Sequence, residues 1–326
     1  PDPVEVCELM WEPLPSERVP LPPRLQVLPE TGFVGRDAIR KSLQALWRVA
    51  GERERCELAL LAGEPGIGKT RLAMHVALET RTEGATVLYG RCDEEFGLPY
   101  QPWIEALRHL VVNAPLELLE AHVEAHAGEL SRLAPELSAR VVDLPEPRAS
   151  DPEVERYLLF GAVVGMLEET CRAEPVVLLL DDLHWADKPT LSLLKHVVRS
   201  GKPMRLLVLA TFRDSEISAD HPLTALLADL RREDCVERIE LDGLEPLEVI
   251  SFIEAAAGHE LTQDGVMLAQ EVTRETDGNP FFVGEILRHL EESGAVVQGS
   301  DGRWVVDRGL SELGLPRSVR EVVGRR

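Results

Sequence analysis

The sequence predicts an α/β fold built on a parallel sheet, followed by a smaller helical region. Five short apolar segments, at residues 58–62, 86–89, 176–180, 206–210 and 236–241, alternate with stretches of helical apolar spacing. This alternation is typical of a sheet covered by helices on both faces. The first, third and fourth segments are almost continuously apolar, as expected of strands that are buried on both faces.

Size and composition limit what the chain can be. Its 326 residues fit two to three packed units of about 100 to 200 residues each. The net charge of -22 has the wrong sign for direct nucleic-acid binding over a broad face. The five cysteines include no CxxC pair, which favours a reducing cytosol over a disulfide framework or zinc site. Apolar runs are far shorter than the ~20 residues that span a bilayer, so we expect a cytoplasmic protein without a membrane role.

The strongest motif lies directly after the first predicted strand. Residues 63–70 read Gly-Glu-Pro-Gly-Ile-Gly-Lys-Thr and match the P-loop pattern G-x-x-x-x-G-K-[ST]. The glycines let backbone N–H groups face phosphate oxygens at a helix N-terminus. Lys69 is expected to meet the β and γ phosphates and Thr70 to ligate magnesium, so the predicted cofactors are ATP or ADP with Mg²⁺. The residues expected to bind nucleotide here are Gly63, Gly66, Gly68, Lys69, Thr70 and Arg71.

A second motif follows the third predicted strand. The apolar run 176–180 leads into Asp181 and Asp182, which gives it the form of a Walker B strand. Asp181 is expected to hold magnesium, directly or through water. Asp182 is a candidate to polarise the attacking water; because two adjacent carboxylates repel, it could instead serve only to bind metal or to contact His184. The sequence leaves these roles open.

Two further sets of residues carry weaker signals. Arg213 follows the strand at 206–210 and would emerge beside Asp181 if the two strands are neighbours. It is therefore a candidate γ-phosphate sensor, with a surface salt bridge as the alternative. His122 and His126 have a metal-ligand spacing on a helix, but they lack the HExxH order and an obvious third ligand. For this pair we predict a solvated helix face.

Five motifs in sequence order resemble those of STAND-class signal-transduction ATPases: Phe-Val-Gly-Arg at 33–36, the P-loop at 63–70, Leu-Leu-Leu-Asp-Asp-Leu-His-Trp-Ala-Asp at 178–187, Ala-Thr-Phe-Arg-Asp at 210–214 and Gly-Asn-Pro at 278–280. The resemblance covers about residues 33–326. It is shared by large ATP-binding regulators of the LuxR family and by bacterial proteins in which a class III nucleotide cyclase precedes the ATPase.

The resemblance implies an AAA-like core, a helical lid and then a winged helix. Such a protein is a slow switch: ADP holds a closed form, and ATP with a signal opens it for self-oligomerisation. By motif, Val34 and Arg36 would lie near the base and phosphates, Pro280 would touch the base from the lid, and Arg213 would be the sensor. The candidate catalytic residues are then Lys69, Asp182 and Arg213, with weak ATPase activity controlling an effector domain, a cyclase or a helix-turn-helix DNA-binding domain, outside this chain.

The implied organisation has four parts. Residues 1–32 would be the end of an upstream domain, resembling the closing strand after a cyclase core, and a proline-rich extended linker. Residues 33–243 would be the nucleotide-binding domain, with a helical insertion at about 102–170. Residues 244–293 would be the lid, and 294–326 a hairpin and the start of a winged helix cut off by the chain end. A ring-forming AAA+ motor and a P-loop phosphotransferase remain as alternative functions.

Overall fold

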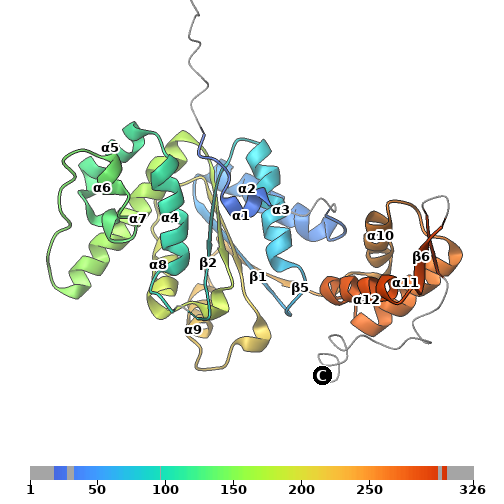
Figure 1. The fold of residues 1–326 in the computed structure, drawn as a ribbon. Helices are drawn as coiled ribbons and strands as arrows, with labels where there is room; N and C mark the ends of the chain where they lie inside the picture. The colour runs from blue at the N-terminus through green and yellow to red at the C-terminus, as the bar shows by residue number, and fades with distance from the viewer. Residues whose placement is uncertain (1–17, 28–32, 96, 300–302, 307–326) are drawn as a thin grey trace, which may run out of the picture.

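The computed structural model describes residues 18–27, 33–95, 97–299 and 303–306. They form a sheet layered between helices, and beyond one edge of the sheet lies a bundle of three helices (Figure 1). The sequence resemblance predicts this bundle as a lid, and we call it the lid below. The five strands are β1 (Cys56–Gly63), β2 (Thr86–Arg91), β3 (Val176–Asp181), β4 (Leu206–Thr211) and β5 (Val236–Leu241). All five predicted strands are therefore present.

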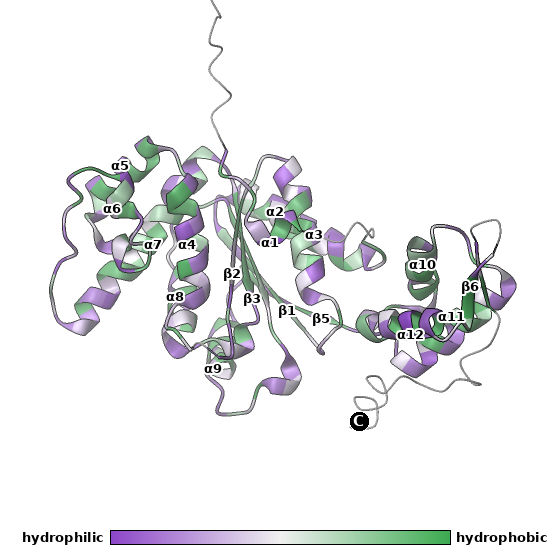
Figure 2. Ribbon diagram, viewed as in Figure 1, coloured by the Kyte–Doolittle hydropathy of each residue, from purple (hydrophilic) through white to green (hydrophobic). Residues whose placement is uncertain are grey.

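The strands are parallel and lie in the order β2-β3-β4-β1-β5. Every residue of β3 and β4 is buried, and so is β1 up to Gly63, because helices cover both faces of these strands. Figure 2 shows apolar residues along the central strands. β5 is an edge strand, and its side chains are largely exposed or half-buried. Because the strands are parallel, the carboxyl ends of β1, β3 and β4 lie at the same edge of the sheet, where ligands of such sheets bind.

One face of the sheet packs against α2 (Asp37–Arg53) and α3 (Lys69–Thr82). The other face packs against α4 (Gln101–Asn113), α7 (Pro152–Ala173) and α8 (Lys188–Val198). Beside them lie α5 (Leu116–His126), α6 (Leu137–Arg140) and α9 (Pro222–Leu230). The fully described stretch 102–170 contains helices and no strand, as the sequence indicated. None of the described helices is long and apolar enough to cross a membrane.

The proline-rich segment before the sheet differs from the extended linker that the sequence predicted. Within it, α1 (Pro23–Gln26) is a short helix. Val19 and Leu25 are 5% and 2% exposed because both contribute to the hydrophobic core around the sheet. Apolar side chains thus fix residues 18–27 against the domain. The predicted strand at 4–11 lies outside the described residues.

Three helices form the lid: α10 (Pro246–Ala257), α11 (Gln263–Thr276) and α12 (Pro280–Glu292). They enclose a separate apolar core that includes Val249, Val272 and Ile286. Pro246 occupies the first turn of α10, as expected of a residue without a backbone N–H. The hairpin strands β6 (Val296–Gln298) and β7 (Trp304–Val306) follow and pair antiparallel. Most of the hairpin turn and the predicted winged-helix start, 307–326, lie outside the described residues.

Candidate functional site

The loop between β1 and α3 requires glycine at three positions. Gly63, Gly66 and Gly68 have φ angles of 145°, 77° and 97°, which side chains disfavour. A Cβ on Gly63 would lie 2.7 Å from the Leu241 carbonyl oxygen, and one on Gly66 would lie 2.7 Å from the Phe281 Cβ. The loop therefore approaches both β5 and the lid more closely than any other residue type would permit, and it leads directly into the N-terminus of α3.

Lys69 is buried at the first position of α3, with 6% of its surface exposed. Its Nζ donates to the carbonyl oxygens of Gly63 and Glu64, each at 2.8 Å. Burial, above all, and then the positive charge of Arg213 lower the pKa of Lys69 to about 8, although the two aspartates after β3 partly oppose this. The ammonium group is thus held inside the loop, with a pKa below that of an ordinary lysine.

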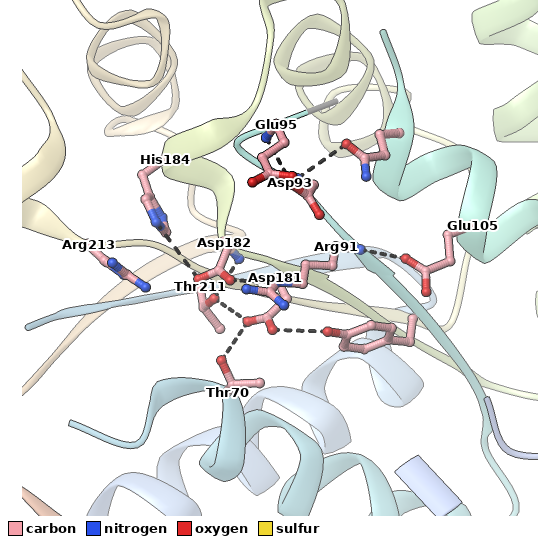
Figure 3. Close-up of polar contacts among 12 residues, drawn as sticks. Thr70, Arg91, Asp93, Glu95, Glu105, Asp181, Asp182, His184, Thr211 and Arg213 are labelled. Carbon is pink, nitrogen blue, oxygen red and sulfur yellow. Dashed lines mark hydrogen bonds and ion pairs between the residues drawn. The ribbon is translucent and has the colours of Figure 1, made fainter. Parts of the chain in front are cut away.

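The Asp181 carboxylate accepts hydrogen bonds from three hydroxyl groups (Figure 3). Its Oδ1 accepts from Thr70 Oγ1 at 2.7 Å and from Thr211 Oγ1 at 2.6 Å, while its Oδ2 accepts from the Tyr89 hydroxyl at 3.1 Å. The carboxylate is 4% exposed. Burial, above all, and then the Asp181 charge raise the pKa of Tyr89, so this phenol stays a donor. A carboxylate beside a threonine hydroxyl is the hard oxygen donor set that Mg²⁺ prefers, so these residues fit the ion.

Asp182 has different partners. Its φ of 59° places it in the left-handed region, and its backbone N–H donates to Thr211 Oγ1 at 3.0 Å. Its Oδ2 accepts from Arg91 Nε at 2.8 Å, and its Oδ1 lies 3.9 Å from His184 Nε2. The two neighbouring carboxylates therefore differ in their surroundings: hydroxyls surround Asp181, and a guanidinium and an imidazole face Asp182 (Figure 3).

Arg213 emerges near this pair, because β3 and β4 are neighbours as the sequence argument required. Its Nη1 forms an ion pair with Glu216 Oε1 at 2.6 Å, and Glu216 Oε2 in turn lies 3.4 Å from His184 Nε2. Burial lowers the pKa of His184 to about 4, so this imidazole is neutral at physiological pH. The arginine is thus connected to Asp182 through Glu216 and His184, while its role as a γ-phosphate sensor stays a prediction.

A second part of the site lies between the phosphate loop and the lid. A cavity of about 40 Å³ brings together residues from four distant parts of the sequence. Four of the predicted nucleotide-binding side chains line it, together with Gly68 and four apolar residues that were not among the predicted binding residues. The lining residues are Val34, Arg36, Arg71, Pro280, Gly68, Phe33, Ile67, Leu244 and Phe252.

Arg36 connects the phosphate loop with the lid. Its Nη2 donates to the Ile67 carbonyl at 2.5 Å and to the Asp242 carbonyl at 2.9 Å, and its backbone N–H donates to Glu248 Oε1 at 2.5 Å. Burial lowers the pKa of Arg36, against the opposing charges of Glu248 and Asp242. The guanidinium of Arg36 thus joins the phosphate loop to the connection after β5, and the Arg36 backbone N–H contacts α10 of the lid.

The Gly-Asn-Pro motif touches the phosphate loop directly. Asn279 is 2% exposed, and its Nδ2 donates to the Pro65 carbonyl at 3.0 Å. Gly278 has φ 69°, and a Cβ there would lie 2.2 Å from the Leu244 carbonyl oxygen. The glycine allows close packing on the connection between sheet and lid, and the asparagine contacts the loop. Pro280 begins α12 and lines the cavity.

Sequence reasoning missed Tyr89 and Arg91, and it recognised Thr211 only as part of the motif at 210–214. Arg91 and Thr211 end β2 and β4, the strands beside β3, and Tyr89 lies two residues before the end of β2. Polar side chains at these positions were the available signal, because the ends of parallel strands converge at the ligand-binding edge. Asn279 was recognised only as part of a motif.

The prediction of a solvated face for the histidine pair is wrong for His122, which is 0% exposed. Its ring stacks on His126 at a centroid distance of 5.0 Å. The pair is enclosed because α5 packs on α7, where Gly165 leaves room: a Cβ there would lie 2.1 Å from His126 Nε2. Among the described residues no group of three or more His, Cys, Asp or Glu side chains could hold a metal ion.

Comparison with known proteins agrees with this geometry. The family model of the AAA ATPase domain matches residues 32–209, more than half of the chain. The chain belongs to the AAA ATPase domain family. Its P-loop and the strand ending in Asp181 both lie inside the matched range, so the parallel sheet is that of an AAA-like P-loop NTPase.

Two curated relatives match most of this chain. An uncharacterised protein of Rhizobium meliloti is 28% identical over 297 residues, covering 80% of this chain and 26% of that protein. The peroxide stress-activated histidine kinase mak2 of Schizosaccharomyces pombe is 27% identical over 277 residues, covering 73% of this chain and 11% of the kinase. The chain thus spans about a quarter and about a tenth of the length of these relatives.

Among solved structures, one similar fold is a signal transduction ATPase with numerous domains from Pyrococcus horikoshii, which carries a tetratricopeptide repeat sensor. It has 18% sequence identity and a TM-score of 0.45, and the match covers 85% of this chain and 32% of that one.

Proposed function

We propose that this AAA domain is a regulatory switch that binds ATP or ADP with Mg²⁺, hydrolyses ATP slowly and passes its nucleotide state to an attached effector. One observation carries the proposal: Asn279 of the lid donates a hydrogen bond to Pro65 of the phosphate loop at 3.0 Å. A lid that contacts the loop itself responds to what the loop binds.

The residues have distinct roles in binding. The backbone N–H groups of the loop and the N-terminus of α3 receive the phosphates, and Lys69 supplies a positive charge from within the loop. Thr70 and Asp181 hold Mg²⁺, which neutralises charge on the phosphates. Val34 and Pro280 flank the base, and Arg71 lines the same cavity.

Hydrolysis involves Asp182 and Arg213. Asp182 is the group that polarises the attacking water. Its ion pair with Arg91 at 2.8 Å opposes this role, because the guanidinium engages the carboxylate. Arg213 senses the γ phosphate after leaving Glu216. Both groups start in ion pairs within the protein, which supports slow turnover.

The effector lies outside this chain. The sequence resemblance to LuxR-family regulators and to cyclase-linked ATPases supports a nucleotide cyclase or a helix-turn-helix domain in this role, with self-oligomerisation in the ATP-bound form. The length of the two curated relatives, of which the chain spans 26% and 11%, is consistent with attachment to further domains.

Nucleotide exchange and turnover test the proposal. We expect tightly held ADP and turnover below ~0.01 s⁻¹, in the range of switch NTPases before activation. Asn279→Ala should release a fluorescent ADP analogue several-fold faster. Asn113→Ala should not, because the Nδ2 of Asn113 donates to the His109 carbonyl of its own helix. Sustained turnover of ~10 s⁻¹, typical of metabolic enzymes, together with unchanged ADP release in Asn279→Ala, would overturn the switch.

The same assays recognise the two alternative functions. A ring-forming motor would show turnover that rises steeply with protein concentration, since its arginine finger comes from a neighbouring subunit. A phosphotransferase would place the γ phosphate on a small acceptor and not on water.

A further inference from the structure

Tyr89 occupies an unusual place for a core residue. It is 1% exposed, and its hydroxyl donates to Asp181 Oδ2 at 3.1 Å. The two threonine hydroxyls, of Thr70 and Thr211, both contact the other oxygen, Oδ1. Within the described part of the chain, the phenol thus supplies the hydrogen bond to Oδ2.

The geometry around Asp181 makes this bond important once a metal ion binds. A carboxylate turns easily about its terminal torsion angle, which is broad and roughly two-fold. Thr70 can ligate Mg²⁺ through an oxygen lone pair while its O–H still donates to Oδ1. Oδ1 then keeps the hydroxyls of Thr70 and Thr211 as partners, whereas among the described residues Tyr89 is the side chain that orients Oδ2. Partners behind a metal ligand commonly control metal affinity in this way.

The Tyr89 ring also faces residues 18–27, the segment that leads into the domain. The guanidinium carbon of Arg24, in α1, lies 5.8 Å from the ring centroid. Leu25 beside it is buried in the core, and the carbonyl of Pro20 lies 2.8 Å from His109 Nε2 of α4. Residues 18–27 are therefore fixed over the tyrosine by contacts on both sides of Arg24.

A cavity of about 440 Å³ lies at this junction, lined by residues of both the segment and the domain. Glu105 lines it together with Arg24 and Tyr89. The same glutamate accepts a hydrogen bond from the Arg91 backbone N–H at 3.0 Å, and Arg91 pairs with Asp182. The entering segment thus contacts Tyr89, the partner of Asp181, directly. It is connected with Arg91, the partner of Asp182, through Glu105.

We propose that Tyr89 is a positioning residue for Mg²⁺ at Asp181, and that Arg24 couples the segment 18–27 to it. Displacing this segment, to which any upstream domain is attached, then weakens Mg²⁺ binding without touching the phosphate loop. This inference rests on the proposed function, since it assumes that the chain binds nucleotide with Mg²⁺.

The test measures binding, so that hydrolysis does not enter it. The affinity for a fluorescent ATP analogue is determined in EDTA and then at increasing Mg²⁺ concentrations. Tyr89→Phe should raise the Mg²⁺ concentration at half effect about tenfold, as for other partners of metal ligands, with unchanged affinity in EDTA. Arg24→Ala should raise it about two- to fivefold, the size of an exposed or partly buried cation–π contact.

Matched controls exclude general effects of these changes. Tyr157→Phe alters a tyrosine of α7 that is 70% exposed, and Arg48→Ala alters an exposed arginine whose Nε donates to the Gln44 carbonyl of its own helix. Neither should change the Mg²⁺ titration. Thermal unfolding of each variant monitors folding.

The outcomes separate this inference from the proposed function. If the wild-type chain binds no nucleotide with or without Mg²⁺, the proposed function fails. If the wild-type chain shows the Mg²⁺ effect and Tyr89→Phe titrates identically, the positioning role is wrong. An equal loss of affinity in EDTA and in Mg²⁺ would reduce Tyr89 to a structural residue, and an Arg24→Ala titration equal to wild type would overturn the coupling to the entering segment.

Discussion

Arg91 and Asp182 form an ion pair across the ends of β2 and β3, with Nε and Oδ2 2.8 Å apart. The carboxylate is therefore engaged by a residue that the sequence motifs do not include. If Asp182 polarises the attacking water, releasing it from this pair should speed hydrolysis.

We expect Arg91→Ala to raise the single-turnover rate of ATP hydrolysis about three- to tenfold, because the freed carboxylate becomes a better hydrogen-bond acceptor for water. Asp182→Asn should lower the rate by at least ~100-fold, the usual effect of removing a general base. Arg108→Ala, which breaks an exposed pair with Glu136, is the control. A slower Arg91→Ala variant would mean that the arginine itself assists the reaction.

The loop lysine should be essential for binding. Lys69→Ala removes the buried ammonium that donates to two carbonyls of the loop, so we expect no measurable nucleotide affinity in calorimetry. Lys195→Ala removes a lysine that pairs with exposed Asp229 and should bind as wild type does. Wild-type affinity in Lys69→Ala would exclude the loop as the phosphate site.

Nucleotide binding should take up protons near pH 8. Burial and Arg213 lower the pKa of Lys69 from 10.5 to about 8, so about half of the free protein has lost this proton at pH 8. Phosphate binding favours the charged lysine and raises its pKa again. Calorimetry in buffers of different ionisation enthalpy should show uptake of about half a proton at pH 8, with affinity decreasing at higher pH. Binding enthalpies that do not depend on the buffer would contradict this prediction.

The buried His122 should make stability depend on pH. Burial, followed by the charge of His126, lowers the pKa of His122 to about 3, so the unfolded chain binds the proton more readily between pH 6.5 and 3. The free energy of unfolding is then fully retained above pH 6.5 and decreases below it, by up to about 1.4 kcal/mol per pH unit from this group.

Substitution of His122 tests this linkage. Among the described residues, neither ring nitrogen of His122 has a hydrogen-bond partner. His122→Leu should therefore raise the denaturation midpoint and reduce its pH dependence between pH 6.5 and 4. The same substitution at half-buried His289 should leave that dependence unchanged. An unaltered pH profile in His122→Leu would show that other groups control acid unfolding.

The sheet could be predicted from sequence because its central strands are buried on both faces and therefore continuously apolar. The lid was harder: Leu247 has the helical spacing of an apolar stripe, yet it is 77% exposed, while Val249 forms the lid core. Periodicity gives a helix, but the face it buries depends on the tertiary contacts of α10. For the same reason, the sequence could not show that residues 18–27 pack on the domain.

The candidate site divides in a similar way. Motifs identified residues whose spacing along the chain is fixed by chemistry, such as Lys69 and Asp181. The contacts of Tyr89 and Thr211 with Asp181 could not be predicted, because they depend on which strands are neighbours. For Arg36, the motif gave the place but not the contacts: its guanidinium binds the carbonyls of Ile67 and Asp242.

The connection between sheet and lid packs closely at Gly243, where a Cβ would lie 1.8 Å from the Asp277 carbonyl oxygen. Beside it, the Asp242 carbonyl accepts from Arg36, which also contacts the phosphate loop at Ile67. The 13 residues of α12 span about 20 Å, so a rotation of about 20° at its first residue would displace its last residue by about 7 Å. A small change in the orientation of the lid at the loop would therefore be a displacement of several ångströms at the end of α12 from which the hairpin begins.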